Sequence, residues 1–400
     1  MPRILIFDVL FPVLYGKWRT IEINHFLSHP LFETDILVSP YQRYIDSVVK
    51  ENLDVHFQRY YQTYPYLNDY NILIFNPIYN FLNKFNKRLN GTLFNGKAVG
   101  DFLLTKKLDF DWTSYDVGYS IFLMARDHNY KLINSRLWPS VCKIYPGGGY
   151  TFNNPQIKAN MALMKHEYII STQAFITIDI QHFFPPHHFK TIYGCPTLDP
   201  KEDLPDKILS PENRLNICFT SLGPEHQRKG YNNYSNLVLL FSTKYPTLDI
   251  TFHVVGGCTS YPIGTSNVKY HRHYVPKDLS KFYIDTIDII ISCNNKHTYP
   301  DGFPLGSEAM ICGCIPILCD PWGSNAHFKF GDDCSLVMPY FDISQVEQFI
   351  LSLYHDPLKR NTMSTTIKEK CLSIFGPENQ LVPVSDFILD IVEKNPKQSL

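Results

Sequence analysis

The sequence predicts an α/β protein of two doubly wound domains, in which mostly parallel sheets lie between layers of helices. Short apolar runs of strand length alternate with helix-like patterns along most of the chain, and this alternation is typical of parallel sheets covered on both faces. The 400 residues also exceed what one hydrophobic core usually supports, and they suit two domains.

The first half of the chain opens with its clearest strand. Between Arg3 and Asp8 the chain is continuously apolar, as expected of a central strand buried on both faces. A helix is expected from Thr20, a suitable N-cap, to Leu27. Further strands are expected at 35–39, 71–76, 141–145, 168–171 and 188–193, and a helix from about 174, whereas residues 90–135 fit no single pattern.

A proline-rich polar stretch at 196–213 is the expected linker, so the first domain is predicted to span 1–205 and the second 206–380. Residues 381–400 are expected to form a C-terminal helix that packs back towards the first domain. In the second half, strands are expected at 215–220, 249–255, 287–292 and 315–319, and helices at 233–245, 277–283, 344–353 and 385–392.

The composition excludes several classes of protein. Apolar residues make up 44% and charged residues 19% of the chain, which is typical of a globular protein. A formal net charge of −1 lacks the cationic surplus that general nucleic-acid binding needs, so no nucleic-acid partner is expected. No run approaches the ~20 apolar residues of a membrane span, and the start of the chain lacks a signal-peptide pattern. We therefore expect a cytoplasmic protein, with peripheral membrane contact left open.

Ten cysteines occur without the paired spacing of a zinc site, so we expect reduced, packed thiols and no metal centre. The closest set, Cys312, Cys314 and Cys319, lies on an expected helix and strand. The pair Asp109 and Asp111 falls in the ambiguous stretch and is interpreted as solvated.

The most informative segment is 297–320, which has the sequence HTYPDGFPLGSEAMICGCIPILCD. Two carboxylates, Asp301 and Glu308, bracket an expected loop at 302–306, and a short helix then stops near Gly313. Backbone N–H groups at a helix start bind anions. Ionised carboxylates accept hydrogen bonds from sugar hydroxyls. The segment therefore predicts a site for a ligand that carries both phosphate and hydroxyl groups.

This segment resembles the donor-binding signature of the family 4 glycosyltransferases, which are retaining enzymes of the GT-B fold. The matching residues are Asp301-Gly302-Phe303-Pro304-Leu305-Gly306 and Glu308-Ala309-Met310. Two departures are the first acid, Asp where Glu is usual, and a spacing of 308 − 301 = 7, which is one residue shorter than the family's. The alternative without a ligand-binding role is an ordinary strand-to-helix loop with solvated acidic side chains.

A second segment, Arg228-Lys229-Gly230, comes just before an expected helix. Cations are unfavourable beside a helix N-terminus, so their presence indicates an anion between them. The segment resembles the family's second donor motif, in which a Lys-Gly pair opens the helix. At the family's usual Arg position this chain has Thr220 or Ser221, and Arg228 is the candidate substitute. The alternative is a solvated basic turn.

The resemblance implies two Rossmann-like domains that face each other across a cleft, and three catalytic candidates. Lys229 would neutralise the leaving diphosphate together with backbone N–H groups near 305–307, Asp301 would bind hydroxyls of the transferred sugar, and Glu308 would accept from the ribose hydroxyls. Further donor contacts are implied for Arg228, Gly230, Tyr274, Val275, Gly302, Phe303, Pro304, Leu305, Gly306, Gly148 and Gly149. The only expected small-molecule partner of this site is the nucleotide-sugar, a UDP- or GDP-sugar, with no cofactor or metal ion.

The function predicted from these residues is that of a retaining glycosyltransferase, which moves a hexose or related sugar to a hydroxyl of a glycan or glycoconjugate. Two alternatives stay open. A GT-B-shaped protein could bind a sugar nucleotide or glycan without catalysis, which the missing Arg and the shortened acidic spacing favour. An inverting transferase or epimerase of the same fold usually carries a base early in the first domain, and the 9–20 loop has no His or Asp.

Overall fold

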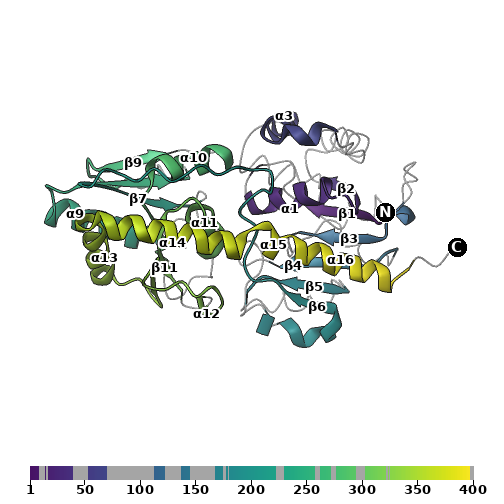
Figure 1. The fold of residues 1–400 in the computed structure, drawn as a ribbon. Helices are drawn as coiled ribbons and strands as arrows, with labels where there is room; N and C mark the ends of the chain where they lie inside the picture. Colours follow the sequence, from purple (N-terminus) through teal and green to yellow (C-terminus); the bar gives the residue numbers. More distant parts are fainter. Residues whose placement is uncertain are drawn as a thin grey trace, which may run out of the picture. The chain divides into compact units, whose positions relative to one another are not determined.

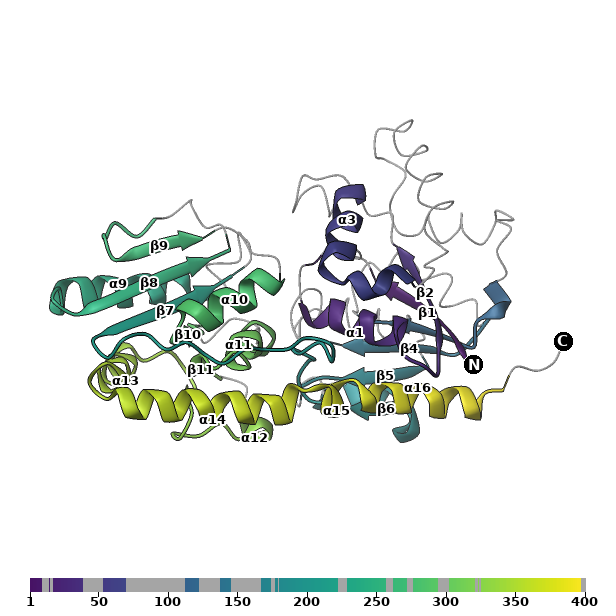
Figure 2. The same ribbon diagram turned by 45° about the horizontal axis from the view of Figure 1, so that its top comes forward.

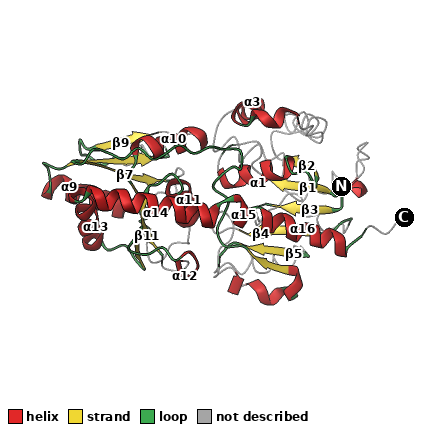
Figure 3. Ribbon diagram, viewed as in Figure 1, coloured by secondary structure: helices red, strands yellow, loops and turns green. Residues whose placement is uncertain are grey.

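The chain divides into two units, Met1–Tyr193 with Gln380–Leu400, and Gly194–Asn379. In this computed structural model the described residues are 1–8, 14, 17–38, 53–69, 112–121, 137–144, 167–173, 177–178, 180–221, 229–256, 262–271, 276–293, 302–320, 323 and 325–396. For 53–57, 68–69, 112, 276–277 and 302–305 only the backbone is described. Each unit contains a six-stranded sheet with helices around it, which confirms the predicted doubly wound α/β class (Figure 3).

The sheet of the first unit has the order β2-β1-β3-β4-β5-β6, and all of its pairings are parallel. Its strands are β1 (Arg3–Asp8), β2 (Glu33–Val38), β3 (Val117–Ser120), β4 (Ser140–Ile144), β5 (Tyr168–Ser171) and β6 (Phe189–Thr191). The three strands β3, β4 and β5 are buried along their whole length, as expected of strands covered on both faces.

Helix α1 (Lys17–Leu27) is enclosed by neighbours in the first unit. Its Phe26 ring packs against Tyr119 of β3, and its Asn24 accepts a hydrogen bond from Tyr60 of α3 (Leu53–Thr63). On another side, His25 bonds the hydroxyl of Ser385 in α16 (Val382–Lys394), which also lies along β5 (Figure 1). Short 3₁₀ turns complete the described part: η1 (Pro65–Asp69), η2 (Trp112–Ser114), η3 (Gln181–Phe183) and η4 (Pro186–His188).

The sheet of the second unit has the order β12-β11-β10-β7-β8-β9, again with parallel pairings (Figure 2). Its strands are β7 (Arg214–Thr220), β8 (Asp249–Val255), β9 (Val268–His271), β10 (Ile289–Ile291), β11 (Ile315–Cys319) and β12 (Leu336–Met338). Numbered within the unit, this is the Rossmann order 3-2-1-4-5-6, in which the chain changes direction between its first and fourth strands. That switch point lies between β7 and β10.

Helices cover both faces of the second sheet. On one face, α9 (Tyr231–Lys244) and α13 (Ile343–His355) share a buried apolar cluster with Leu215, Ile217 and Phe219 of β7. On the other face lie α10 (Pro276–Thr286) and α11 (Gly302–Met310). Helix α14 (Pro357–Phe375) packs against both α11 and α13, and its Met363 belongs to the apolar cluster of the first face. Two short helices, α12 (Asn325–Phe328) and α15 (Pro377–Gln380), complete the elements. None of the helices in the described ranges combines the length and the apolar character that a membrane crossing needs.

Most predicted strands coincide with observed ones, but the start of the first helix was wrong. Helix α1 begins at Lys17, and Thr20 lies inside it, where its hydroxyl donates to the Lys17 carbonyl instead of capping the helix. The ambiguous stretch 90–135 contains β3. The strand expected at 71–76 lies outside the described residues.

The long helix α14 was not predicted at all. Its buried face combines Met363, Ile367 and Cys371 with the polar residues Arg360 and Ser364. These polar residues interrupt the apolar periodicity by which a helix is recognised in sequence. They are tolerated in the interior because each bonds a carbonyl of another segment.

Candidate functional site

The candidate site lies at the carboxyl edge of the second sheet, where three strands end beside the switch point. Ser221 follows β7, Gly256 follows β8 and Cys293 lies just beyond β10. The Ser221 N–H donates to the carbonyl of Val255 at 3.0 Å, so β7 and β8 stay paired to their ends. In open α/β sheets, ligands bind beyond the carboxyl ends of strands at such a point.

Gly230 brings the start of α9 onto the end of β10. Its φ is +77°, and a Cβ at this position would lie 1.7 Å from the carbonyl oxygen of Cys293. The same carbonyl accepts a hydrogen bond of 3.1 Å from the Asn233 side chain. Only glycine allows both the left-handed backbone and this close approach. Gly230 of the Lys-Gly pair found in the sequence therefore has a definite steric role at the switch point.

The N-terminus of α9 is electropositive and uncapped. Gly230 is its N-cap, no side chain supplies a capping hydrogen bond there, and the first turn of the helix contains no acidic residue. The Gly230 carbonyl accepts from the N–H groups of Asn233 and Tyr234. Lys229, half-buried, comes directly before the cap. N–H groups at such a terminus, with a cation beside them, suit a bound anion.

Gly256 makes a second close approach at the same edge. Its φ is +115°, and a Cβ on it would lie 1.5 Å from the carbonyl oxygen of Ser221. Its N–H donates to the His271 carbonyl at the end of β9. Two glycines thus keep the chain close to the ends of β7 and β10, which leaves this edge lined by backbone.

Glu308 approaches the end of β7 from the opposite face of the sheet. It is 6% exposed and lies in the last turn of α11. Burial raises the pKa of Tyr283 well above its usual value, and the negative charge of Glu308 raises it further. The Tyr283 hydroxyl in turn bonds Thr220 Oγ1 at 3.0 Å. The charge of Glu308 therefore acts on the Tyr283 hydroxyl of α10, which is itself bonded to the last residue of β7.

The predicted loop at 302–306 is helical, which corrects the sequence analysis. Helix α11 begins at Gly302, so Glu308 lies about 9 Å along its axis from the start, at 1.5 Å per residue, rather than at the helix N-terminus. N–H groups near 305–307 then bond within the helix, and the free ones belong to its first turn. Pro304 fits that turn because it needs no N–H partner there. A Cβ on Gly306 would meet Met310 and Leu318 at ordinary contact distances of 3.7 and 3.8 Å, so this glycine marks no turn.

Several predicted site residues lie outside the described part of the chain: Arg228, Asp301, Tyr274, Val275, Gly148 and Gly149. For Phe303, Pro304 and Leu305 the backbone alone is described. The structure therefore brings together Lys229, Gly230 and the start of α9 at one edge, with Glu308 behind it. Within the described ranges, no group of three His, Cys, Asp or Glu residues is arranged to hold a metal ion. Nine cysteines in these ranges are buried and form no disulfide, including Cys312, Cys314 and Cys319.

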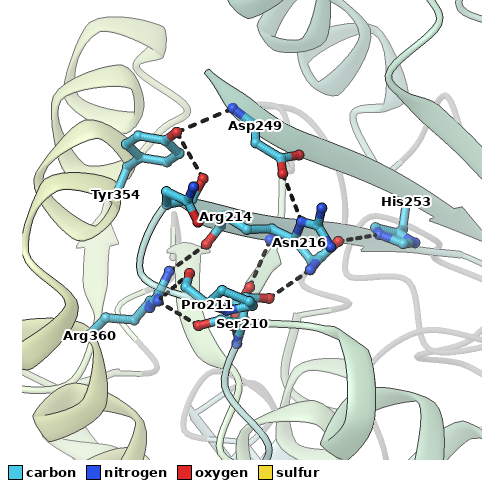
Figure 4. A network of polar contacts seen from close by, with 10 residues as sticks. Ser210, Pro211, Arg214, Asn216, Asp249, His253, Tyr354 and Arg360 are labelled. Atoms are coloured by element: carbon cyan, nitrogen blue, oxygen red, sulfur yellow. Dashed lines mark hydrogen bonds and ion pairs between the residues drawn. The ribbon is translucent and has the colours of Figure 1, made fainter. Parts of the chain in front are cut away.

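A buried polar network holds the segment that leads into β7 (Figure 4). Asp288 accepts hydrogen bonds from the backbone N–H groups of Ser210 and Asn216, at 3.0 and 2.7 Å. Arg360 of α14 donates to the carbonyls of Ser210, Pro211 and Arg214. Residues of the predicted linker are thus bound firmly to the second unit, and they fix where β7 begins.

The same network reaches β9 through two histidines. Asn216 Oδ1 lies 3.0 Å from His253 Nε2, and His253 Nδ1 lies 2.9 Å from His271 Nε2. The Asn216 amide oxygen can only accept, so His253 donates from Nε2 and accepts from His271 at Nδ1. Burial, with the nearby His271 and Lys269, lowers the pKa of His253 to about 3, so the ring is neutral in the folded protein.

No family model matches this sequence, and neither does any curated protein. Solved structures do match the fold. A sucrose-phosphate synthase from Thermosynechococcus elongatus aligns with a TM-score of 0.62 and 11% identity, over 98% of this chain and 100% of that one. A glycosyltransferase from Rickettsia africae aligns with a TM-score of 0.60 and 12% identity, over 100% and 99% of the two chains.

HepE from Anabaena, solved in complex with UDP-glucose, aligns with a TM-score of 0.59 and 13% identity over 98% of this chain and 100% of that one. The chain has the GT-B fold. The match to TarM has a TM-score of 0.56 and 13% identity, and there the chain covers only 57% of the other protein. At these identities the comparisons establish the architecture, whose nucleotide-binding edge in Rossmann-type sheets is the one described above.

Proposed function

We propose that the chain is a retaining glycosyltransferase that takes a sugar from a nucleoside-diphosphate donor. The observation that carries the proposal is the uncapped, electropositive start of α9, with Lys229 beside it, at the switch point of the second sheet. The solved complexes of HepE with UDP-glucose and of TarM with UDP support a UDP-sugar as the donor. The resemblance of 301–310 to the family 4 donor signature supports retention of configuration.

In this proposal the diphosphate lies against the start of α9, and Lys229 supplies a positive charge. Asp301 precedes α11 in sequence and takes hydroxyls of the transferred sugar, while Glu308 takes the ribose hydroxyls. Arg228, Tyr274, Val275, Gly148 and Gly149 complete the donor contacts proposed from the sequence. Residues 206–380 are the donor domain and 1–205 the acceptor domain.

The reaction breaks the bond between the anomeric carbon and the diphosphate oxygen, and the electron pair stays with that oxygen. The acceptor hydroxyl oxygen then bonds the same face of the anomeric carbon, and its proton passes to the leaving phosphate. Negative charge therefore develops next to Lys229 and the N–H groups of α9, where it is stabilised most. We propose a hexose or related sugar as the donor group, a glycan or glycoconjugate as the acceptor, and no metal requirement.

A second candidate is a protein of this fold that binds a sugar nucleotide without transferring the sugar. Two observations favour it: Thr220 or Ser221 occupies the place of the family's arginine, and Glu308 lies in the last turn of α11 rather than at its start. The two candidates differ in turnover and not in binding, so one assay separates them.

The test is to measure binding of UDP and GDP by calorimetry, and hydrolysis or transfer from UDP- and GDP-sugars, with the intact chain. We expect nucleotide binding and turnover, and Lys229→Ala should lower turnover by roughly 10²–10³-fold, since it removes one charge-stabilising group. Lys281→Ala, on the exposed side of α10 (75% exposed), is the matched control and should keep full activity. Full activity in Lys229→Ala would exclude the phosphate assignment, and binding without turnover would favour the second candidate.

A further inference from the structure

Ser221 is a buried hydroxyl without a hydrogen-bond partner among the described residues. The residue is 0% exposed, and its Oγ bonds no other atom there. Nearly all buried polar side chains are hydrogen-bonded, because an unpaired one loses its water without compensation. An orphaned hydroxyl directly after the central strand of a sheet therefore requires an explanation.

The direction of this hydroxyl follows from the alternation of side chains along β7. Thr220 faces α10, because its hydroxyl bonds Tyr283 at 3.0 Å. Phe219 faces α9, because its ring lies 5.7 Å from that of Tyr231. Successive side chains in a strand point to opposite faces, so Ser221 lies on the α9 face, with Phe219.

Helix α9 starts at this same edge of the sheet. It returns from the carboxyl end of β7 towards its amino end, so the part of α9 nearest to Ser221 is its first turn, at Gly230 and Tyr231. Three features therefore lie at this edge of the sheet: an unpaired buried hydroxyl, an uncapped helix N-terminus and a preceding lysine, Lys229. All three can serve one anion, since each offers a hydrogen-bond donor or a positive charge.

We propose that Ser221 Oγ binds the diphosphate of the nucleotide donor and donates a hydrogen bond to one of its phosphate oxygens. This inference rests on the proposed function, because it adds a residue to the same anion site. In this proposal the uncharged hydroxyl stabilises the phosphate by donating a hydrogen bond, in addition to the attraction of the Lys229 charge. It also gives this hydroxyl, which has no partner among the described residues, an acceptor when the ligand is bound.

The test uses three variants of the intact chain. Ser221→Ala removes the hydroxyl, and Ser221→Thr keeps it. Thr265→Val is the matched control, because Thr265 Oγ1 is also a buried oxygen without a partner, but it lies just before β9, at the amino edge of the sheet. Calorimetry with UDP, uridine and inorganic pyrophosphate gives the affinities, and thermal unfolding gives the stability of each variant.

We expect Ser221→Ala to weaken binding of UDP and pyrophosphate by roughly ten- to a hundredfold, as for loss of a hydrogen bond to a charged group. The affinity of this variant for uridine should not change. Its melting temperature should equal or exceed that of the wild type, since an unsatisfied buried group has been removed. Ser221→Thr and Thr265→Val should bind UDP like the wild type. This opposite effect on binding and stability is not produced by a merely structural serine.

If the wild type binds UDP and Ser221→Ala binds it equally well, the inference is wrong while the proposed function stands. If the wild type binds neither UDP, GDP nor pyrophosphate, the proposed function itself is wrong. A weakened uridine affinity in Ser221→Ala would also overturn the inference, because the serine would then act on the nucleoside rather than the phosphates.

Discussion

The two units bury charge in different ways. In the first unit, side chains of opposite charge pair inside the protein: Lys143 Nζ lies 3.0 Å from Glu22 Oε2 with both side chains 0% exposed, and Arg19 pairs with Asp8. In the second unit, Asp288 accepts from backbone N–H groups, and the two terminal nitrogens of Arg360 donate to backbone carbonyls. In the first unit each buried charge is compensated by a side chain of opposite charge. In the second unit the compensating groups belong to the backbone, so they depend on the path of the chain.

This difference predicts how each unit responds to loss of charge. Where the partner is another side chain, neutralising both members removes the uncompensated charge. Where the partners are backbone groups, no second substitution can restore what is lost. Ser221, at the carboxyl edge of the second sheet, follows neither arrangement, because its buried hydroxyl has no partner among the described residues.

The largest effect is expected for Lys143→Met. It leaves Glu22 buried without its counter-charge, and such a loss typically costs ~3–5 kcal/mol of unfolding free energy. Lys143→Met with Glu22→Gln should recover at least half of this loss, because no ionised group is left unpaired. Urea unfolding monitored by fluorescence measures both variants. A double variant no more stable than the single one would contradict the ion-pair interpretation of the first unit.

A somewhat smaller effect is expected for Arg360→Met, about 2–4 kcal/mol, because the carbonyls of Ser210, Pro211 and Arg214 lose a charged donor. The matched control is Arg214→Ala. It keeps the backbone carbonyl but removes an ion pair with Asp249 whose side chains are 52% and 47% exposed, and it should cost less than ~1 kcal/mol. Equal losses in the two variants would show that the backbone contacts of Arg360 contribute little.

The smallest effect is one of pH. The pKa of His253 is lowered to about 3 in the folded protein, so below its ordinary value of 6.5 the unfolded chain binds a proton that the folded protein does not. Stability from this group is complete above pH ~6.5 and falls by about 1.4 kcal/mol per pH unit below it, or about 2 kcal/mol by pH ~5. His253→Gln should flatten the curve of unfolding free energy against pH over this window.

The same titration compares the units directly. Burial, then the charges of His29 and Lys143, lower the pKa of His25 in the first unit to about 4. The contribution of His25 to the unfolding free energy therefore also decreases as the pH falls, as it does for His253. His25→Gln should therefore also flatten the curve below pH ~6.5. An unchanged slope in both variants would mean that neither histidine is held neutral by its surroundings.

Strand positions were predicted well because their signal is local. The runs Arg3–Asp8, Tyr168–Ser171 and Asp249–Val255 were expected with the bounds that the structure has. Helices were predicted less well where a polar residue is buried by a distant partner. Arg360 interrupts the apolar pattern of α14, and the carbonyls that justify its burial lie near residue 210. The spacing of residues within α14 therefore cannot reveal these carbonyl acceptors.

The candidate site divides in the same way. Lys229-Gly230 and Glu308 could be selected from the chain, because their motif order is a property of sequence. Gly302 and Gly306 were expected in a loop, since glycine usually marks turns, but packing of α11 on β11 makes them helical. Ser221 was named only as one of two residues, with Thr220, that could stand in place of an arginine, and its lack of a partner became visible once its surroundings were known.

By itself the sequence determined the alternation of strands and helices, the two-domain architecture and the positions of the Lys-Gly and acidic motifs, because these depend on neighbours along the chain. Only the tertiary structure decided where α11 begins, that Gly230 rests on the Cys293 carbonyl, and that Ser221 has no partner. The physical reason is that close approach, burial and hydrogen bonding at these positions are set by residues tens of positions away, which meet only when the sheet has formed.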